Sequence, residues 1–192
     1  VNIEQSQDIN FTNHGTITAA DKSVLYCKTC SDVTFINTGT MSGGNNAVVI
    51  SHGDNTTITN SGTITATTDN SGLNISSTDG TVVTNTGTIS GVDHGMQSSN
   101  VDNSTITNHG TISASSNSGY GILYENDGSN RVNNTLNNYG TISATSGSFA
   151  DGIGIGRNAN PMFNITINNY GTISGSDDSI KMLNSSNTGI NI

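Results

Sequence analysis

One seven-residue phrase recurs seven times along this 192-residue chain and constrains its fold more than any other feature. The phrase reads Asn, any residue, Gly, Thr, Ile or Met, Ser or Thr, and then Ala or Gly. Its copies begin at Asn13, Asn37, Asn60, Asn85, Asn108, Asn138 and Asn169. Self-similarity at such a period is typical of an array of stacked units. We therefore expect residues 1–192 to form a single repeat domain.

Alternation with period two surrounds each copy and predicts short strands. An apolar residue lies two positions before each Asn, and another lies two positions after each Gly. A third short run with alternate apolar residues separates the copies, at 47–50, 72–75, 121–124, 152–155 and 179–182. Three strands per period, stacked about 4.8 Å apart, predict an all-β parallel β-helix of about seven to eight coils.

The fixed Asn and Gly of the phrase are expected to build a corner of each coil. Stacked Asn side chains can form a ladder of amide hydrogen bonds, as in cross-β assemblies. The Gly two residues later can adopt the positive φ that a corner requires. This pattern favours a structural role for the phrase over a catalytic one.

Composition and charge exclude several kinds of partner. The chain carries 14 acidic and 5 basic side chains, for a net charge of −9. Nucleic acids and anionic membrane surfaces both select for clustered Lys and Arg, so neither is an expected partner. No segment has the roughly 18 apolar residues of a transmembrane helix. The acidic, hydroxyl-rich composition instead indicates an extracellular surface.

The two cysteines, Cys27 and Cys30, form a Cys-Lys-Thr-Cys pair. A zinc site needs a second pair, and a thioredoxin-like motif needs a βαβ unit. In an exported protein, we expect a disulfide that closes a small loop after the strand at 24–26. Free thiols are the main alternative, and a redox or metal role is a further one.

The phrases at 106–114 (ITNHGTISA) and 167–175 (INNYGTISG) resemble repeats in the passenger domains of Gram-negative autotransporters, the type V secreted proteins. The resemblance covers nearly the whole chain and implies a right-handed β-helix that is displayed on the bacterial outer surface or released. It implies adhesion to a host cell-surface protein, matrix or glycan, or association with another copy of itself; a subset of such passengers are toxins. The sequence looks like a segment of a longer passenger.

An enzymatic function is the main alternative class. Polysaccharide lyases and tailspike-like hydrolases share the parallel β-helix, and glycoside hydrolysis needs paired carboxylates at a defined separation. Only Asp177 and Asp178 are adjacent acids here, and neighbours in a strand point to opposite faces. We therefore expect no catalytic residue, no metal and no cofactor, and an ordinary loop at 177–178 rather than a calcium-bridged turn.

Two rows of hydroxyl residues are expected on the outside of the helix. In each phrase, the residues on either side of the buried Ile or Met are Thr followed by Ser or Thr. The leading row is the candidate self-association face: Thr16, Thr40, Thr63, Thr88, Thr111, Thr141 and Thr172. A flat Thr array also resembles ice-binding solenoids, but Ser at five of the seven second positions breaks the methyl regularity.

A second candidate binding region lies where the repeat is interrupted. The last two intervals between phrase glycines are 30 and 31 residues, against 23 to 25 before them. Recognition residues concentrate on loops held by a rigid scaffold, and Tyr and Arg are common interface anchors. The candidate loop residues are Tyr120, Tyr124, Phe149, Arg157 and Phe163. The alternative for Tyr124 is that it fills a widened core.

Overall fold

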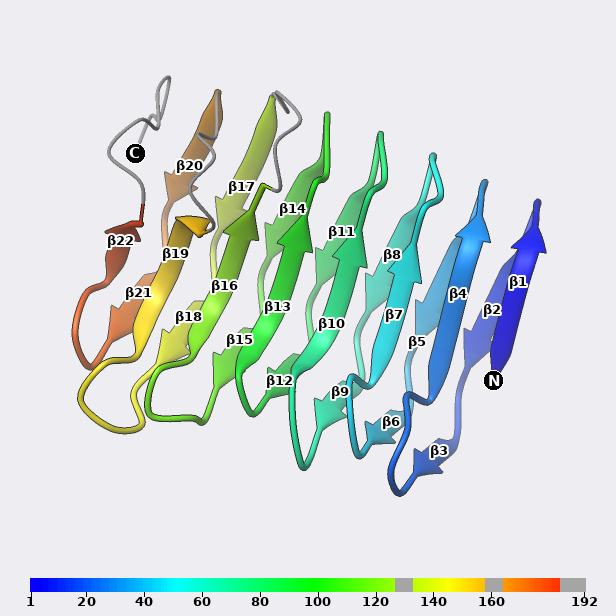
Figure 1. Ribbon diagram of the computed structural model, residues 1–192, viewed down its shortest axis with the longest axis horizontal. Helices are drawn as coiled ribbons and strands as arrows, with labels where there is room; N and C mark the ends of the chain where they lie inside the picture. The colour runs from blue at the N-terminus through cyan, green and yellow to red at the C-terminus, as the bar shows by residue number, and fades with distance from the viewer. Residues whose placement is uncertain (127–132, 158–163, 184–192) are drawn as a thin grey trace.

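The computed structural model describes residues 1–126, 133–157 and 164–183 and confirms a parallel β-helix with three strands per coil (Figure 1). Each coil ascends in the front sheet and descends behind it while the chain advances from right to left, which is a right-handed winding. The described residues form 22 strands and no helix. None of them therefore belongs to a helix that could cross a membrane.

The strands form three parallel sheets in which each strand pairs with its equivalents in the adjacent coils. Sheet A contains β1 (Asn2–Ser6), β4 (Leu25–Cys30), β7 (Val48–Ser51), β10 (Ser71–Ser76), β13 (His94–Ser99), β16 (Tyr120–Glu125), β19 (Asp151–Arg157) and β22 (Ile180–Met182). Sheet B contains β2 (Asn10–Asn13), β5 (Thr34–Asn37), β8 (Thr57–Asn60), β11 (Val82–Asn85), β14 (Thr105–Asn108), β17 (Asn134–Asn138) and β20 (Ile165–Asn169). Sheet C contains β3 (Thr16–Ala19), β6 (Thr40–Gly43), β9 (Thr63–Ala66), β12 (Thr88–Gly91), β15 (Thr111–Ala114), β18 (Thr141–Ala144) and β21 (Thr172–Gly175).

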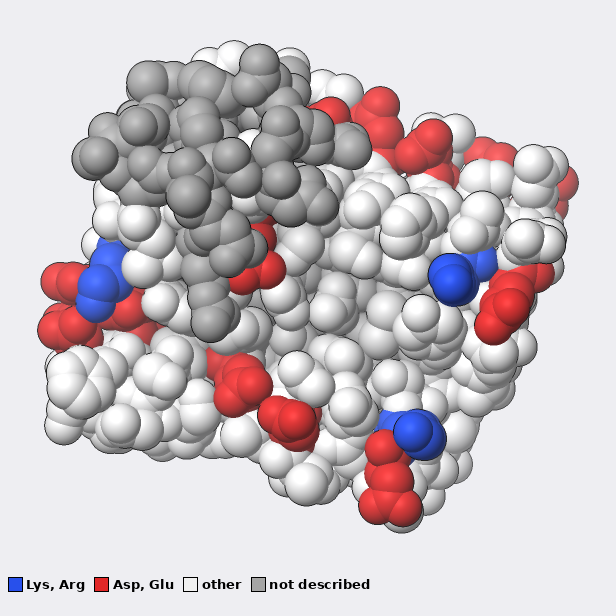
Figure 2. Space-filling model, viewed as in Figure 1, with Lys and Arg blue, Asp and Glu red and all other residues white. Residues whose placement is uncertain are grey.

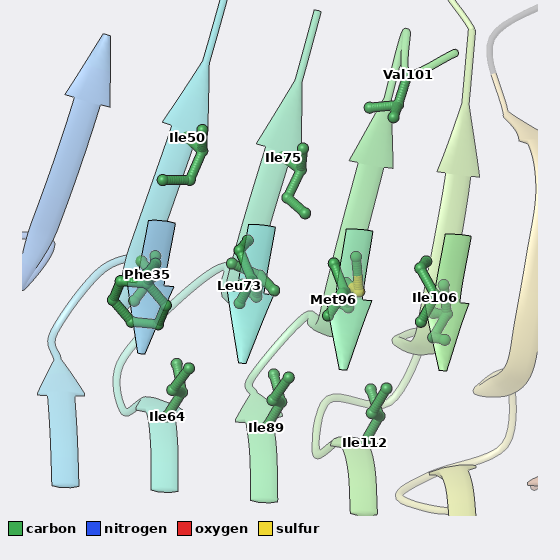
Figure 3. Packing of buried hydrophobic residues seen from close by; sticks show 14 of the residues in the cluster. Phe35, Ile50, Ile64, Leu73, Ile75, Ile89, Met96, Val101, Ile106 and Ile112 are labelled. Atoms are coloured by element: carbon green, nitrogen blue, oxygen red, sulfur yellow. The ribbon is translucent and has the colours of Figure 1, made fainter. Parts of the chain in front are cut away.

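The core consists of columns of apolar side chains that repeat from coil to coil (Figure 3). Sheet C contributes Ile64, Ile89 and Ile112 in register, each with an exposure of 0%. Sheets A and B contribute parallel columns through Leu73 and Ile106. A few buried side chains from each coil thus suffice for a thin core, which accounts for a chain with only 31% hydrophobic residues.

The predicted amide ladder is present at the corner between sheets B and C. The Nδ2 of each phrase Asn donates to the Oδ1 of the Asn in the next coil, at 2.8 to 2.9 Å, from Asn13 through Asn169. The same Nδ2 also donates to nearby backbone carbonyls; that of Asn85 reaches the oxygens of Gly87 and Thr111, each at 3.2 Å. Every buried amide of this ladder is thereby paired, as buried polar groups require.

The reason for the phrase Gly differs from the one predicted. The described glycines with positive φ are Gly80, Gly147 and Gly156, and none of them belongs to the phrase. A Cβ on Gly87 would instead collide with the carbonyl oxygen of Gly62 in the preceding coil. Close approach of successive coils, rather than φ, therefore selects Gly at this corner.

Candidate binding surfaces

The outer side of sheet C is a continuous array of Thr and Ser hydroxyl groups, here called the hydroxyl face. Its seven strands place their first and third residues outward and their second residue in the core. The first-position column, in register across every strand, is Thr16, Thr40, Thr63, Thr88, Thr111, Thr141 and Thr172. The third-position column is Thr18, Ser42, Thr65, Ser90, Ser113, Ser143 and Ser174.

Hydroxyl groups make this face complementary to itself. None of its 14 residues is ionisable, and each hydroxyl can both donate and accept a hydrogen bond. The central threonines are half-buried because their neighbours lie one coil away on either side. Thr65 Oγ1 and Ser90 Oγ lie 3.0 Å apart, so some of this capacity is used within the face. The remainder is available to a second surface.

Sheet B presents a second uncharged face, which the sequence analysis missed. Its outward columns are Asn10, Thr34, Thr57, Val82, Thr105, Thr135 and Thr166, and Thr12, Ile36, Thr59, Thr84, Thr107, Asn137 and Asn168. The period-two alternation just before each phrase Asn is the sequence pattern that indicates this outward face. The hydroxyl pattern is interrupted by Asn10, Ile36, Val82, Asn137 and Asn168, and Val82 is 43% exposed. This face is therefore less regular than the hydroxyl face.

The structure corrects the assignment of Tyr124 to a binding loop. Strand β16 continues through Tyr124, whose side chain is directed into the core with an exposure of 0%. Burial raises the pKa of its hydroxyl above the usual range for tyrosine. The hydroxyl oxygen makes no hydrogen bond. Tyr124 therefore fills the core, as the alternative interpretation predicts, and is not available to a ligand.

The other loop candidates do not gather into one described site. Tyr120 is half-buried, with its ring centroid 5.5 Å from that of His94. Phe149 is 63% exposed in the turn before β19. Arg157 ends β19, whose length of about 20 Å separates the two ends. The side chain of Arg157 and the whole of Phe163 lie outside the described residues.

Three exposed rings stack at the variable position of the phrase. The ring centroids of His109 and Tyr139 are 4.7 Å apart, and those of Tyr139 and Tyr170 are 5.0 Å apart, with nearly parallel planes. Tyr139 and Tyr170 are 49% and 69% exposed. Because the faces of Tyr139 are covered by its neighbours, this stack mainly presents ring edges and hydroxyl groups. It stabilises the corner, as aromatic pairs do.

A groove with a volume of about 660 Å³ lies on the outer side of sheet A, near the N-terminal coils. Tyr26 and Val49, which are adjacent in register, contribute its apolar surface. Asparagine side chains, Lys22 and His52 add polar groups, and the lining includes no Asp or Glu among the described residues. Figure 2 views this side of the molecule, where basic and acidic side chains lie next to one another and no large basic patch forms.

An ionic cluster joins the last two described coils. Lys181 Nζ lies 2.6 Å from an oxygen of Asp177, 3.5 Å from Asp151 and 3.6 Å from Asp178. The hydrogen bond with Asp177 raises the pKa of the Lys181 ammonium. Asp177 and Asp178 are adjacent in the sequence, but Asp151 is 26 residues from Asp177, so no local pattern predicts that it joins them.

Cys27 and Cys30 form a disulfide, as predicted, with their Cα atoms 5.9 Å apart. Its position differs from the expected one, because β4 extends through both cysteines rather than ending before them. Both cysteine side chains are buried in the core. The bridge therefore belongs to the inner face of a strand and not to a surface turn.

These features define a right-handed β-solenoid in which sheets B and C present uncharged outer faces. In comparisons with protein-family models, curated proteins and solved structures, nothing matches the chain.

Proposed function

We propose that this chain is a non-enzymatic binding module, a segment of a bacterial surface adhesin that associates with further copies of itself through the hydroxyl face. The single observation that carries the proposal is the register of two uncharged Thr and Ser columns across all seven strands of sheet C. The resemblance of the repeats to autotransporter passengers supports an extracellular location, displayed on the outer surface or released.

Electrostatics favours an uncharged face, such as the hydroxyl face, as the contact between copies. A protein with a net charge of −9 repels its own copies, so contact is least opposed where no side chain is ionised. A hydroxyl surface can form hydrogen bonds with an identical surface, and each bond contributes roughly 0.5–1.5 kcal/mol. Because the columns run the length of the solenoid, many weak contacts form together and their effects combine.

Sedimentation velocity over a range of protein concentrations tests this proposal. We expect concentration-dependent oligomers of the parent chain and monomers of a variant with Thr63→Glu and Thr111→Glu, since two carboxylates per copy would face each other. The matched control is Thr57→Glu with Thr105→Glu, at the same strand positions of sheet B in the same coils.

Three outcomes would contradict the proposal. These are a parent chain that remains monomeric at millimolar concentration, a sheet C variant that associates like the parent, and loss of association confined to the sheet B control. Circular dichroism must show the same β-sheet signal for all three proteins.

Glycan binding is the second candidate, favoured by the groove on sheet A. Its exposed Tyr26 ring and several side-chain amides are groups that suit a neutral sugar, with an apolar surface and a few placed polar contacts. Cleavage of a polysaccharide would need two carboxylates at a defined separation, whereas the ionisable side chains described in the lining are Lys22, Tyr26 and His52. The groove therefore favours binding over hydrolysis.

A further inference from the structure

Three carboxylates from two successive coils converge at the corner between sheets C and A. Asp151 begins β19, while Asp177 and Asp178 lie in the turn before β22. One oxygen from each residue lies within 4.8 Å of the others. Asp177 and Asp178 are exposed, and Asp151 is buried with an exposure of 1%.

The fold does not require a buried negative charge at the position of Asp151. Its Oδ1 accepts a hydrogen bond of 2.9 Å from the backbone N–H of Asp178 in the next coil. Asn46 occupies the same register position four coils earlier, and its Oδ1 accepts an equivalent bond of 3.1 Å from Ser71 N–H. A neutral amide thus performs the structural task without the cost of burying a charge.

The second oxygen of Asp151 has no hydrogen bond. Asp151 Oδ2 is buried and faces the cluster, with Lys181 Nζ at 3.5 Å as its charged neighbour. That ammonium makes its short contact with Asp177 instead, at 2.6 Å. A buried oxygen without a partner is costly, and one ammonium offsets only one of three negative charges. The cluster therefore favours a more highly charged cation.

We propose that Asp151, Asp177 and Asp178 bind a calcium ion, which displaces the Lys181 side chain into solvent. The Lys181 side chain is 32% exposed and has an open route to leave. Ca²⁺ takes six to eight oxygen ligands at about 2.3–2.6 Å in flexible geometry, so waters on the exposed side of Asp177 and Asp178 can complete the shell. Zinc prefers nitrogen and sulfur ligands, and Mg²⁺ demands a near-ideal octahedron.

The proposed ion would link two coils. Asp151 belongs to one coil and the Asp177–Asp178 turn to the next, so the ion would join them more strongly than the long contacts to Lys181. Ile173 and Ile180 in that later coil are only partly buried, so it gains less from apolar packing than the central coils. This inference does not depend on the proposed adhesive function.

Calcium titration of the 192-residue chain provides the test, with thermal unfolding and sensitised Tb³⁺ emission as the two readouts. We expect calcium at about 100 times its dissociation constant to raise the melting temperature by about 5 °C relative to EDTA. Lys181→Gln removes the competing ammonium and should bind calcium about tenfold more tightly. Asp151→Asn keeps the hydrogen-bond acceptor and should abolish the shift.

Asp21→Asn is the matched control, because Asp21 is an exposed acid in the turn between β3 and β4, at the same corner of an early coil. Its calcium response should equal that of the parent. Two results would overturn the proposal: no calcium response of the parent chain at 10 mM, even if Lys181→Gln responds, and an undiminished response of Asp151→Asn.

Discussion

Single side chains determine how well successive coils pack, and Tyr124 is the one that needs the most space in the core. It is the largest fully buried side chain of the described residues. The same column holds Ser98 in the preceding coil and Ile155 in the following one. A small residue beside a large one keeps the summed volume of the column nearly constant, as close packing requires. The position of Tyr124 is therefore explained by packing and not by recognition.

Removing the Tyr124 hydroxyl should not weaken the fold. Its oxygen is buried without a hydrogen bond, a condition that costs roughly 1–3 kcal/mol. We predict that Tyr124→Phe equals or exceeds the parent in its free energy of unfolding at pH 7, measured by urea denaturation. A loss of more than about 1 kcal/mol would show that the hydroxyl has a stabilising partner.

The same substitution should alter the response to alkaline pH. Burial raises the pKa of Tyr124 in the folded chain, whereas an unfolded tyrosine loses its proton near pH 10. Above that pH the unfolded state binds fewer protons than the folded state, so stability falls as pH rises. Urea denaturation at pH 9 and at pH 11 should show a smaller loss for Tyr124→Phe than for the parent. An equal loss would contradict the assignment.

At the scale of the strand and its corner, neighbouring coils decide which residues are tolerated. Gly87 and Gly15 occupy the same place in the phrase and differ in their surroundings. A Cβ on Gly87 would meet the backbone of Gly62 and Ser61, whereas a Cβ on Gly15 meets no atom within 4 Å.

This pair gives a direct test of the close-approach explanation. Gly87→Ala should destabilise the chain by about 3 kcal/mol or more, because backbone atoms must move to admit the methyl group. Gly15→Ala should change stability by less than about 0.5 kcal/mol. Chemical denaturation of both variants measures the difference. If the two substitutions changed the free energy of unfolding by similar amounts, the close-approach explanation would be contradicted.

The strands could be predicted from the sequence because their period is local, whereas contacts between coils depend on insert lengths. Alternation around Ile64 and Ile106 indicates a strand with one buried face. The spacing of the phrase also predicts the amide ladder through Asn85. By contrast, predicting that Asp151 lies next to Asp178 requires the path of the chain through a 31-residue repeat. No local sequence pattern gives that path. The loop assignment of Tyr124 was wrong for a different reason: the alternation at 121–124 already places Ile122 and Tyr124 on the same face of a strand.

At the scale of the whole molecule, charge is distributed unevenly over the three sheets. The outward positions of sheets B and C hold no ionisable side chain among the described residues, whereas sheet A presents Glu4, Lys28 and Lys181. The sequence predicted the uncharged rows of sheet C but not those of sheet B. A solenoid of about seven coils, roughly 35 Å long, thus offers two long faces on which copies can approach without repulsion.

The central claim is that copies meet through the hydroxyl face, and spin labelling tests it directly. The two native cysteines of the chain form a disulfide, so a single introduced cysteine can be labelled selectively. Thr67 lies at the edge of the hydroxyl face after β9, and Thr57 begins β8 of sheet B in the same coil; both are exposed.

Faces packed together lie about 10 Å apart, close enough for dipolar broadening between labels on two copies. At concentrations where the chain associates, we predict broadening of the electron paramagnetic resonance spectrum for the label at Thr67→Cys and an unbroadened spectrum for Thr57→Cys. Broadening at Thr57→Cys alone, or at neither position in the associated state, would contradict the claim.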